Sequence, residues 1–170
     1  AMVFLPELRV GGMQIFKSEG FDTFGKILPR ATEIAAQVAW LYVGLTGACA
    51  VIYIATGMRS FDAVLHAMTT IATGGFSTYD SSFVKFGAST EYAAVVFMCL
   101  AALPFVRYVQ LINGAPGSLF LDSQVRVFFI VLLVTVGFLT LVLWQGHQLA
   151  GELGFRKALF NVVSITTGTG

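Results

Sequence analysis

One stretch of 25 residues without a charged side chain limits this chain to a membrane-type fold. The stretch runs from Ile34 to Met58 and lies between Glu33 and Arg59. An α-helix rises about 1.5 Å per residue, so roughly 20 apolar residues cross the hydrocarbon core of a bilayer. A soluble helix usually keeps one polar face, and this stretch shows almost none. The stretch therefore predicts a transmembrane helix rather than a buried helix of a soluble protein.

Two further apolar segments repeat this signal. Val127 to Gly146 carries no charge, and Tyr92 to Ile112 is apolar but interrupted by Pro104 and Arg107. Only 11% of all residues are charged, against about 25% in an average soluble domain. The mean hydropathy is +0.82. We therefore predict an all-α integral membrane protein, and the net charge of +1 gives no indication of nucleic-acid binding.

A unit of about 95 residues recurs along the chain. A shift of 94 residues (57 to 151) pairs Gly57 with Gly151, Phe61 with Phe155, Leu65 with Leu159, Ile71 with Ile165, Thr73 with Thr167 and Gly74 with Gly168. A second match places Leu5-Pro6-x-x-Arg9 against Leu103-Pro104-x-x-Arg107, 98 residues later (5 to 103). The chain therefore holds one complete unit, with partial units on both sides.

The complete unit reads as helix, short helix, loop, helix. We expect an outer helix from Thr32 to Met58, Ser60 as the N-cap of the short helix, and Asp62 in its first turn. The short helix has about 11 residues, which are enough to cross only half of a bilayer. Residues 79–90 should form an exposed connection. The predicted boundaries are 1–14 for the end of an inner helix, 15–31 for a linker, 32–112 for the complete unit (pore helix 60–71, filter 71–78), 113–125 for a turn and 126–170 for the start of the next unit.

The distribution of Lys and Arg predicts the topology. Six of them share one side and four the other, which favours placing the 15–31 linker and the 113–125 turn in the cytoplasm. The loops that follow the short helices then open to the outside. Arg107 lies within an apolar segment, and two roles are open for it: snorkelling to the cytoplasmic interface, or gating and subunit contact.

A run of threonine and glycine follows the short helix at Thr69 to Thr78, with a weaker copy at Ser164 to Gly170. A potassium ion that crosses a membrane exchanges its water shell for oxygen ligands, which consecutive backbone carbonyls can supply. Glycine tolerates the positive φ that such a path requires. The negative end of the preceding helix dipole also favours a cation. These features predict cation-coordinating pore loops.

Other site chemistries have little support. The sequence shows no paired carboxylates, no Ser/His/Asp set and no Cys/His cluster, so we expect no enzyme. His66 and His147 lack partner ligands, which favours packing and an interfacial position, and Cys49 and Cys99 read as unpaired thiols. A glycine-rich turn in a non-conducting membrane scaffold or receptor module remains the alternative to a pore loop.

Three motifs resemble one family. Ala67 to Asp80 looks like the second pore loop of the TrkH/TrkG potassium-uptake proteins. Leu5 to Gln14 is similar to the end of their first unit, and Val163 to Gly170 resembles the start of their third filter. The resemblance implies four linked helix–pore-helix–helix (M1-P-M2) units around one potassium-channel-like pore. It further implies K⁺ as the transported ion, a homodimer in the bacterial inner membrane in contact with lipid, and a cytosolic TrkA-like nucleotide-binding ring as regulator.

Carried over residue by residue, the resemblance implies two of the four filter segments. The K⁺-binding residues would be Ile71, Ala72, Thr73, Gly74 and Gly75 in one segment, and Ser164, Ile165, Thr166, Thr167 and Gly168 in the other. Which glycine matches the one shared by the other units, Gly74 or Gly75, stays open. The first and fourth filters are absent, so we expect this chain to form only part of a pore.

Overall fold

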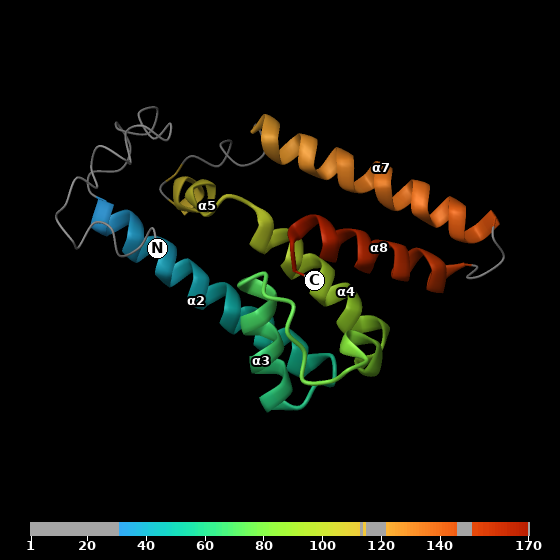
Figure 1. The fold of residues 1–170 in the computed structure, drawn as a ribbon. Coiled ribbons are helices and arrows are strands. Elements are labelled where there is room, and N and C mark those ends of the chain that lie inside the picture. The colour runs from blue at the N-terminus through green and yellow to red at the C-terminus, as the bar shows by residue number, and fades with distance from the viewer. Residues whose placement is uncertain (1–30, 113, 115–121, 146–150, 170) are drawn as a thin grey trace.

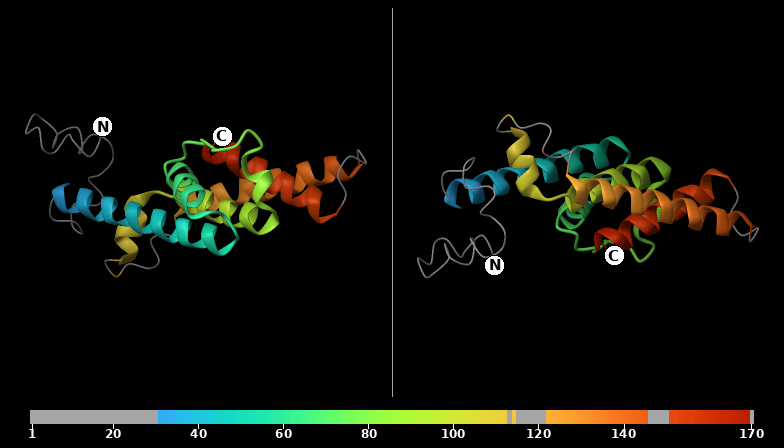
Figure 2. Two further views of the ribbon diagram at one scale, coloured as in Figure 1. Left: turned by 90° about the horizontal axis from the view of Figure 1, so that it is seen from below. Right: turned by 90° about the horizontal axis from the view of Figure 1, so that it is seen from above.

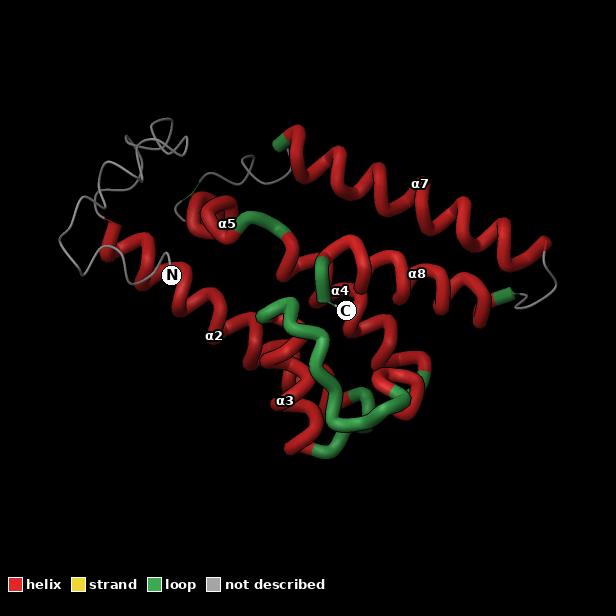
Figure 3. Tube along the Cα trace, in the orientation of Figure 1, coloured by secondary structure: helices red, strands yellow, loops and turns green. Residues whose placement is uncertain are grey.

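The described residues fold into helices joined by short loops, without a strand in this part of the chain (Figures 1 and 3). The structure, a computed structural model, describes residues 31–112, 114, 122–145 and 151–169. Its elements are α2 (Ala31–Ala55), α3 (Ser60–Ile71), the 3₁₀ helix η2 (Ser82–Phe86), α4 (Ala88–Ala102), α5 (Phe105–Ile112), α7 (Ser123–Gln145) and α8 (Glu152–Thr167). The predicted all-α class and the order of long helix, half-length helix, loop and helix are confirmed. The predictions for residues 1–30, for most of the 113–125 turn and for His147 lie outside the described residues.

Two described helices have the length and composition to cross a membrane. They cover Glu33–Ala55 in α2 and Ser123–Gln145 in α7. The pair α4 and α5 gives a third span if the two helices are counted together, and they meet at an angle of 85°. Large apolar side chains such as Trp40, Leu133 and Phe138 are exposed on the long helices. An apolar outer face of this kind suits contact with lipid tails.

The two repeats pack through the helix α4. Helix α3 lies against α2 and α4, while α8 lies against α4 and α7 (Figures 1 and 2). Buried side chains from these helices form one apolar core, with Tyr53, Ala67, Met98 and Val163 among its members. The half-length helices α3 and α8 therefore both pack against the inner helix α4. Their relative placement depends on this shared neighbour.

Proline breaks the inner helix where the sequence predicts. Helix α4 ends at Ala102, and Pro104 has no N–H to offer to the carbonyl of Leu100, one turn earlier. The hydroxyl of Tyr108 donates to this carbonyl at 2.8 Å. A backbone carbonyl at membrane depth needs such a partner, since no bulk water reaches it. Tyr108 thus donates the shorter of two hydrogen bonds to the Leu100 carbonyl, and the Leu103 N–H donates the other at 3.4 Å.

Arg107 lies in α5, just beyond this break. Its Nε is 2.7 Å from Oδ2 of Asp122, which immediately precedes α7, and its guanidinium also donates to Gln110 at 3.0 Å. The ion pair therefore joins the end of one repeat to the start of the next. Gating or subunit contact by Arg107 stays a prediction.

The predicted helix 60–71 agrees with α3, but two local predictions, the N-cap residue and the exposure of the connection 79–90, are wrong. The N-cap of α3 is Arg59 rather than Ser60, because the Arg59 carbonyl already accepts the Ala63 N–H at 2.9 Å. The connection predicted as exposed contains η2, with Phe83 buried, and the start of α4, with Thr90 buried. These residues face the neighbouring helices, and a local sequence pattern cannot show such burial.

We predict that Tyr108→Phe destabilises the protein because it leaves the Leu100 carbonyl with only the longer bond from the Leu103 N–H, at 3.4 Å. The loss of one intramolecular hydrogen bond costs about 0.5–1.5 kcal/mol. Thermal unfolding of the purified full-length protein measures this loss of stability. In a Pro104→Ala background a backbone N–H is restored, so the cost of Tyr108→Phe should fall. An equal loss in both backgrounds would contradict this explanation.

Candidate functional site

The half-length helix α3 ends in a tight reversal at the Thr/Gly run. The N–H of Gly74 donates to the Thr69 carbonyl at 2.7 Å, and the N–H of Thr73 donates to the Thr70 carbonyl at 3.2 Å. This pair of bonds is the Schellman motif, in which the residue after the cap adopts a left-handed conformation. That residue is Thr73, with φ of 50°. A β-branched residue is strained there, by about 1–2 kcal/mol, so the surrounding contacts must impose this conformation.

The reversal leaves a row of carbonyl groups available. Residues 72–75 lie outside α3, and Ala72, Gly74 and Gly75 are exposed. Among the hydrogen bonds of the described residues, none is accepted by a carbonyl of residues 71–75. Gly75 has φ of 68°, in the region that favours glycine. The segment therefore has the free oxygens and the backbone freedom that an ion-coordinating loop requires.

Side chains of α3 hold the following segment in place. Residues 76–79 run back along the helix (Figure 3). Thr69 Oγ1 donates to the Phe76 carbonyl at 2.9 Å, and Thr78 Oγ1 donates to Asp62 Oδ1 at 3.1 Å. The Tyr79 hydroxyl donates to Asp62 Oδ2 at 3.1 Å. The loop is thus fixed by contacts along the length of its own half-helix.

His66 adds another fixing point. Its Nδ1 lies 2.8 Å from the Asp62 carbonyl, which only accepts, so Nδ1 carries the hydrogen. In the neutral ring Nε2 then accepts the hydroxyl of Ser77 at 3.0 Å. The ring is fully buried and makes edge contacts with Phe83 and Phe86, at centroid distances of 5.2 and 5.3 Å. The predicted packing role of His66 is confirmed.

Asp62 is the charged centre of this fastening, at the outer end of α3 and outside the spanning helices. Burial alone would raise the pKa of its carboxyl group. Hydrogen bonds from Thr78, Tyr79 and Arg59 outweigh burial and hold the pKa below the ordinary 3.8. Arg59 Nε donates to Asp62 at 3.0 Å and a second guanidinium nitrogen donates to Tyr79. The sequence predicted only the helix-dipole role of Asp62, because nothing local indicates that Thr78 and Tyr79 return to it.

Tyr53 supports the end of α3 from behind. Its hydroxyl shares a hydrogen bond of 3.0 Å with Thr70 Oγ1, and its ring is fully buried between α2 and α3. Edge contacts with Phe83 and Phe97 hold the ring at centroid distances of 5.8 and 6.3 Å. The last turn of α3 is therefore held against α2 by one buried side-chain hydrogen bond, which aromatic side chains surround.

The second half-length helix ends in the same way. The N–H of Thr169 donates to the Ser164 carbonyl at 2.9 Å, and that of Gly168 donates to the Ile165 carbonyl at 3.2 Å. Gly168 has φ of 73° and holds the place that Thr73 holds after α3. Ser164, Ile165, Thr166 and Thr167 all belong to the last turn of α8. Of the five residues predicted for this filter segment, four are therefore still helical, and the chain leaves the helix only at Gly168.

This geometry also corrects the register of the repeat. The shift of 94 residues holds before the helices, where Gly57 and Gly151 both have positive φ of 101° and 71°. At the helix ends the hydrogen bonds pair Thr73 with Gly168, a shift of 95 residues (73 to 168). The pairing of Gly74 with Gly168, one of the two alternatives left open by the sequence, does not fit these hydrogen bonds. The corrected register favours Gly75 as the glycine shared between units, because it places Gly75 opposite Gly170 in the sequence.

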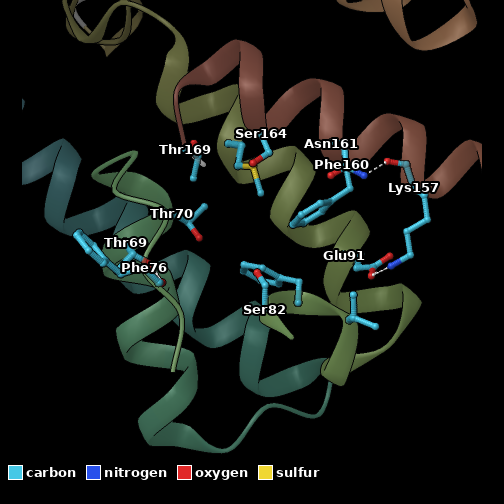
Figure 4. Close-up of a pocket in the computed structure, with 14 residues that line it drawn as sticks. Thr69, Thr70, Phe76, Ser82, Glu91, Lys157, Phe160, Asn161, Ser164 and Thr169 are labelled. Atoms are coloured by element: carbon cyan, nitrogen blue, oxygen red, sulfur yellow. Dashed lines mark hydrogen bonds and ion pairs between the residues drawn. The ribbon is translucent and has the colours of Figure 1, made fainter. Parts of the chain in front are cut away.

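Both loops border one cavity of about 370 Å³ (Figure 4). Gly75 and Phe76 line it from the first loop, and Ser164 and Thr169 line it from the end of α8. Of the predicted site residues, Gly75 and Ser164 thus reach the shared cavity, whereas Ile71 is buried in the core and Ile165 is exposed. Two half-length helices that end in loops beside one cavity, between long apolar helices, define a membrane protein of the pore-loop class.

Comparison with known proteins gives the family. Residues 2–170 match the family model TrkH, described as a cation transport protein. The chain belongs to the TrkH family. It is 38% identical over 174 residues to the Trk system potassium uptake protein TrkI of Halomonas elongata. The aligned region covers 99% of this chain and 35% of that protein. It is 35% identical over 175 residues to the Trk system potassium uptake protein TrkH of Escherichia coli (strain K12), covering 100% of this chain and 36% of that protein.

A solved structure agrees with this assignment. The crystal structure of the potassium transporter TrkH from Vibrio parahaemolyticus matches with a TM-score of 0.80 and 31% sequence identity. The match covers 96% of this chain and 34% of that one. This chain therefore spans about a third of the length of the relatives it matches.

We predict that Asp62→Asn loosens residues 76–80, because an NH₂ group, which cannot accept, replaces one of the two oxygens that accept from Thr78, Tyr79 and Arg59. Hydrogen exchange of the full-length protein should show lower protection in this segment. Since the pKa of Asp62 in the folded protein lies below the ordinary 3.8, its contribution to stability is present at neutral pH and is lost as the pH falls below 3.8 and through the lower folded pKa. In this acidic range the unfolding temperature of Asp62→Asn should therefore depend less on pH than that of the wild type. Asp80→Asn, on the same exposed loop, is the matched control and should behave as the wild type; equal protection in both variants would argue against the fastening.

Proposed function

We propose that this chain is the central part of a potassium-translocating membrane protein. The single observation that carries the proposal is the set of carbonyl groups at residues 71–75, which lie at the carboxyl end of a half-length helix and accept no hydrogen bond from the described part of the chain. Family membership supports it, since the relatives described above are potassium uptake proteins. These relatives are transport proteins, and we expect no catalysis from this chain.

The proposed chemistry is replacement of the ion's water shell. Carbonyl oxygens of Ile71, Ala72, Thr73, Gly74 and Gly75 would form one segment of the filter, and the chain from Thr167 and Gly168 onward would begin another. In this view Ser164, Ile165 and Thr166 form the helix end that directs the negative dipole toward the ion. Side chains of α3 hold the first loop before an ion arrives, so the oxygens need little reorganisation when the ion binds.

Assembly and regulation follow from the family resemblance. We propose four helix–pore-helix–helix units around one pore, of which this chain provides the second and half of the third. We further propose a homodimer in the bacterial inner membrane, in contact with lipid and regulated by a TrkA-like nucleotide-binding ring. The apolar outer faces of α2 and α7 support the membrane part of this proposal.

Gly75→Ala tests the role of the loop. Gly75 has φ of 68°, where a side chain is strained, so the substitution should turn the neighbouring carbonyls away from their positions. In proteoliposomes with the full-length protein, we expect the K⁺/Na⁺ flux ratio to fall about tenfold, equivalent to about 1.4 kcal/mol of ion discrimination. Thr73→Ala and Gly74→Ser should act in the same direction.

The matched control is Gly44→Ala in α2, where an added Cβ meets nothing within 4 Å. This variant should keep the wild-type flux ratio. A wild-type protein that carries no K⁺ would refute the proposed function. Loop variants that transport like the wild type would instead favour a non-conducting scaffold or a different ion path.

A further inference from the structure

A buried carboxylate joins the inner helix of one repeat to the half-length helix of the next. Glu91, in the first turn of α4, is only 2% exposed. The Nζ of Lys157 in α8 donates to Glu91 Oε1 at 2.6 Å, and Arg156 Nε lies 3.4 Å from Oε2. Glu91 Oε2 and Arg156 Nε make no hydrogen bond within the described structure, so Lys157 supplies the directed bond and Arg156 adds charge.

More exposed residues complete this ion-pair cluster. Glu152, with 61% of its side chain exposed, lies 3.3 Å from Arg156 Nε and accepts the hydroxyl of Tyr92 at 2.9 Å. Glu91 is therefore shielded from water, whereas the Lys157 side chain is partly exposed and Glu152 is mostly exposed. An ion pair is worth more in the shielded part because the effective dielectric constant is lower there.

Ring contacts continue this junction toward the first loop. Phe160 of α8 packs on Phe83 at a centroid distance of 5.4 Å, and Phe83 in turn meets His66 of α3 at 5.2 Å. His66 is the residue that holds Ser77 behind the first loop. The orientation of α8 is thus linked through buried contacts to the element that fixes the loop after α3.

The register of the helix ends gives Lys157 a specific position. A shift of 95 residues places Lys157 (62 to 157) where α3 has Asp62. Asp62 binds the loop of its own repeat, whereas Lys157 binds the inner helix of the preceding repeat. Glu91 and Lys157 also line the cavity that Gly75 and Thr169 border (Figure 4). The two equivalent positions therefore carry opposite charges and have different partners.

We propose that Glu91 and Lys157 are positioning residues for ion selection. Resting on the proposed function, the inference is that their ion pair sets the orientation of α8 on α4 and thereby the spacing of the two carbonyl-bearing loops. A buried ion pair contributes little net stability compared with apolar side chains of the same size. Such a pair can instead favour one orientation of α8 on α4 over others. Because this orientation sets the spacing of the two loops, K⁺/Na⁺ selectivity is the property that reports it.

The test compares the K⁺/Na⁺ flux ratio of full-length variants in proteoliposomes, at equal amounts of monodisperse protein. Glu91→Gln removes the charge but keeps the shape, and we expect the ratio to fall about tenfold. Lys157→Gln should also lower the flux ratio. This variant should fold more readily than Glu91→Gln, because Lys157 is partly exposed. Glu152→Gln is the matched control on the same cluster and should keep the wild-type ratio.

Each outcome decides the inference separately from the proposed function. The wild-type flux of K⁺ tests the function. If the wild type selects K⁺ and both Glu91→Gln and Lys157→Gln keep its ratio, the positioning role is refuted while the function stands. If Glu91→Gln fails to fold, Lys157→Gln alone decides. A loss of selectivity shared by Glu152→Gln would also overturn the inference, because it would show a general sensitivity to charge.

Discussion

In the proposed pore, the helices α3 and α8 end where the membrane offers no bulk water to their last carbonyl groups. This constraint determines most of what surrounds them, because irregular backbone at membrane depth must be buried in protein or face a wet cavity. The Schellman motif uses the amides of Thr73 and Gly74 to close the end of α3, and no donor from the described part of the chain reaches the carbonyls of residues 71–75. In a soluble protein water would satisfy them. In the pore that we propose, a desolvated cation is the partner that their charge favours.

Free carbonyls can select an ion only if the loop that carries them keeps its shape. The left-handed conformation of Thr73 is not one that the residue would choose, so outside contacts must maintain it. Asp62 and His66 hold the outgoing segment, and Tyr53 holds the last turn of the helix. These side chains come from the half-length helix and the outer helix of the same repeat. The strain at one residue is thus balanced by several ordinary hydrogen bonds around it.

Much of this fold could be predicted from the sequence, because membrane helices depend on local composition. The spans, the half-length helix and the break at Pro104 follow from charge, length and the missing N–H of proline. The ends of the helices could not be predicted to the residue. Identical residues in the two repeats indicate a shift of 94 residues. The reversal after α8 nevertheless lies 95 residues after the reversal that follows α3. Hydrogen bonds to carbonyls several residues back set that point, and the identity of single residues reports it poorly.

Burial of polar residues was the harder part to predict. Thr90 ends the segment predicted as an exposed connection and Glu91 directly follows it, yet both are buried, and Glu91 is paired with α8 of the next repeat. Their partners lie far along the chain: Thr90 donates to Thr56, and Glu91 accepts from Lys157. Within one repeat the same sequence would have no reason to bury a carboxylate. Burial of Glu91 is therefore a consequence of joining repeats in one chain, where the partner at each junction can differ. A pore built from such repeats can hold its loops in similar places with different ion pairs, and the register shared by Asp62 and Lys157 is one case of this.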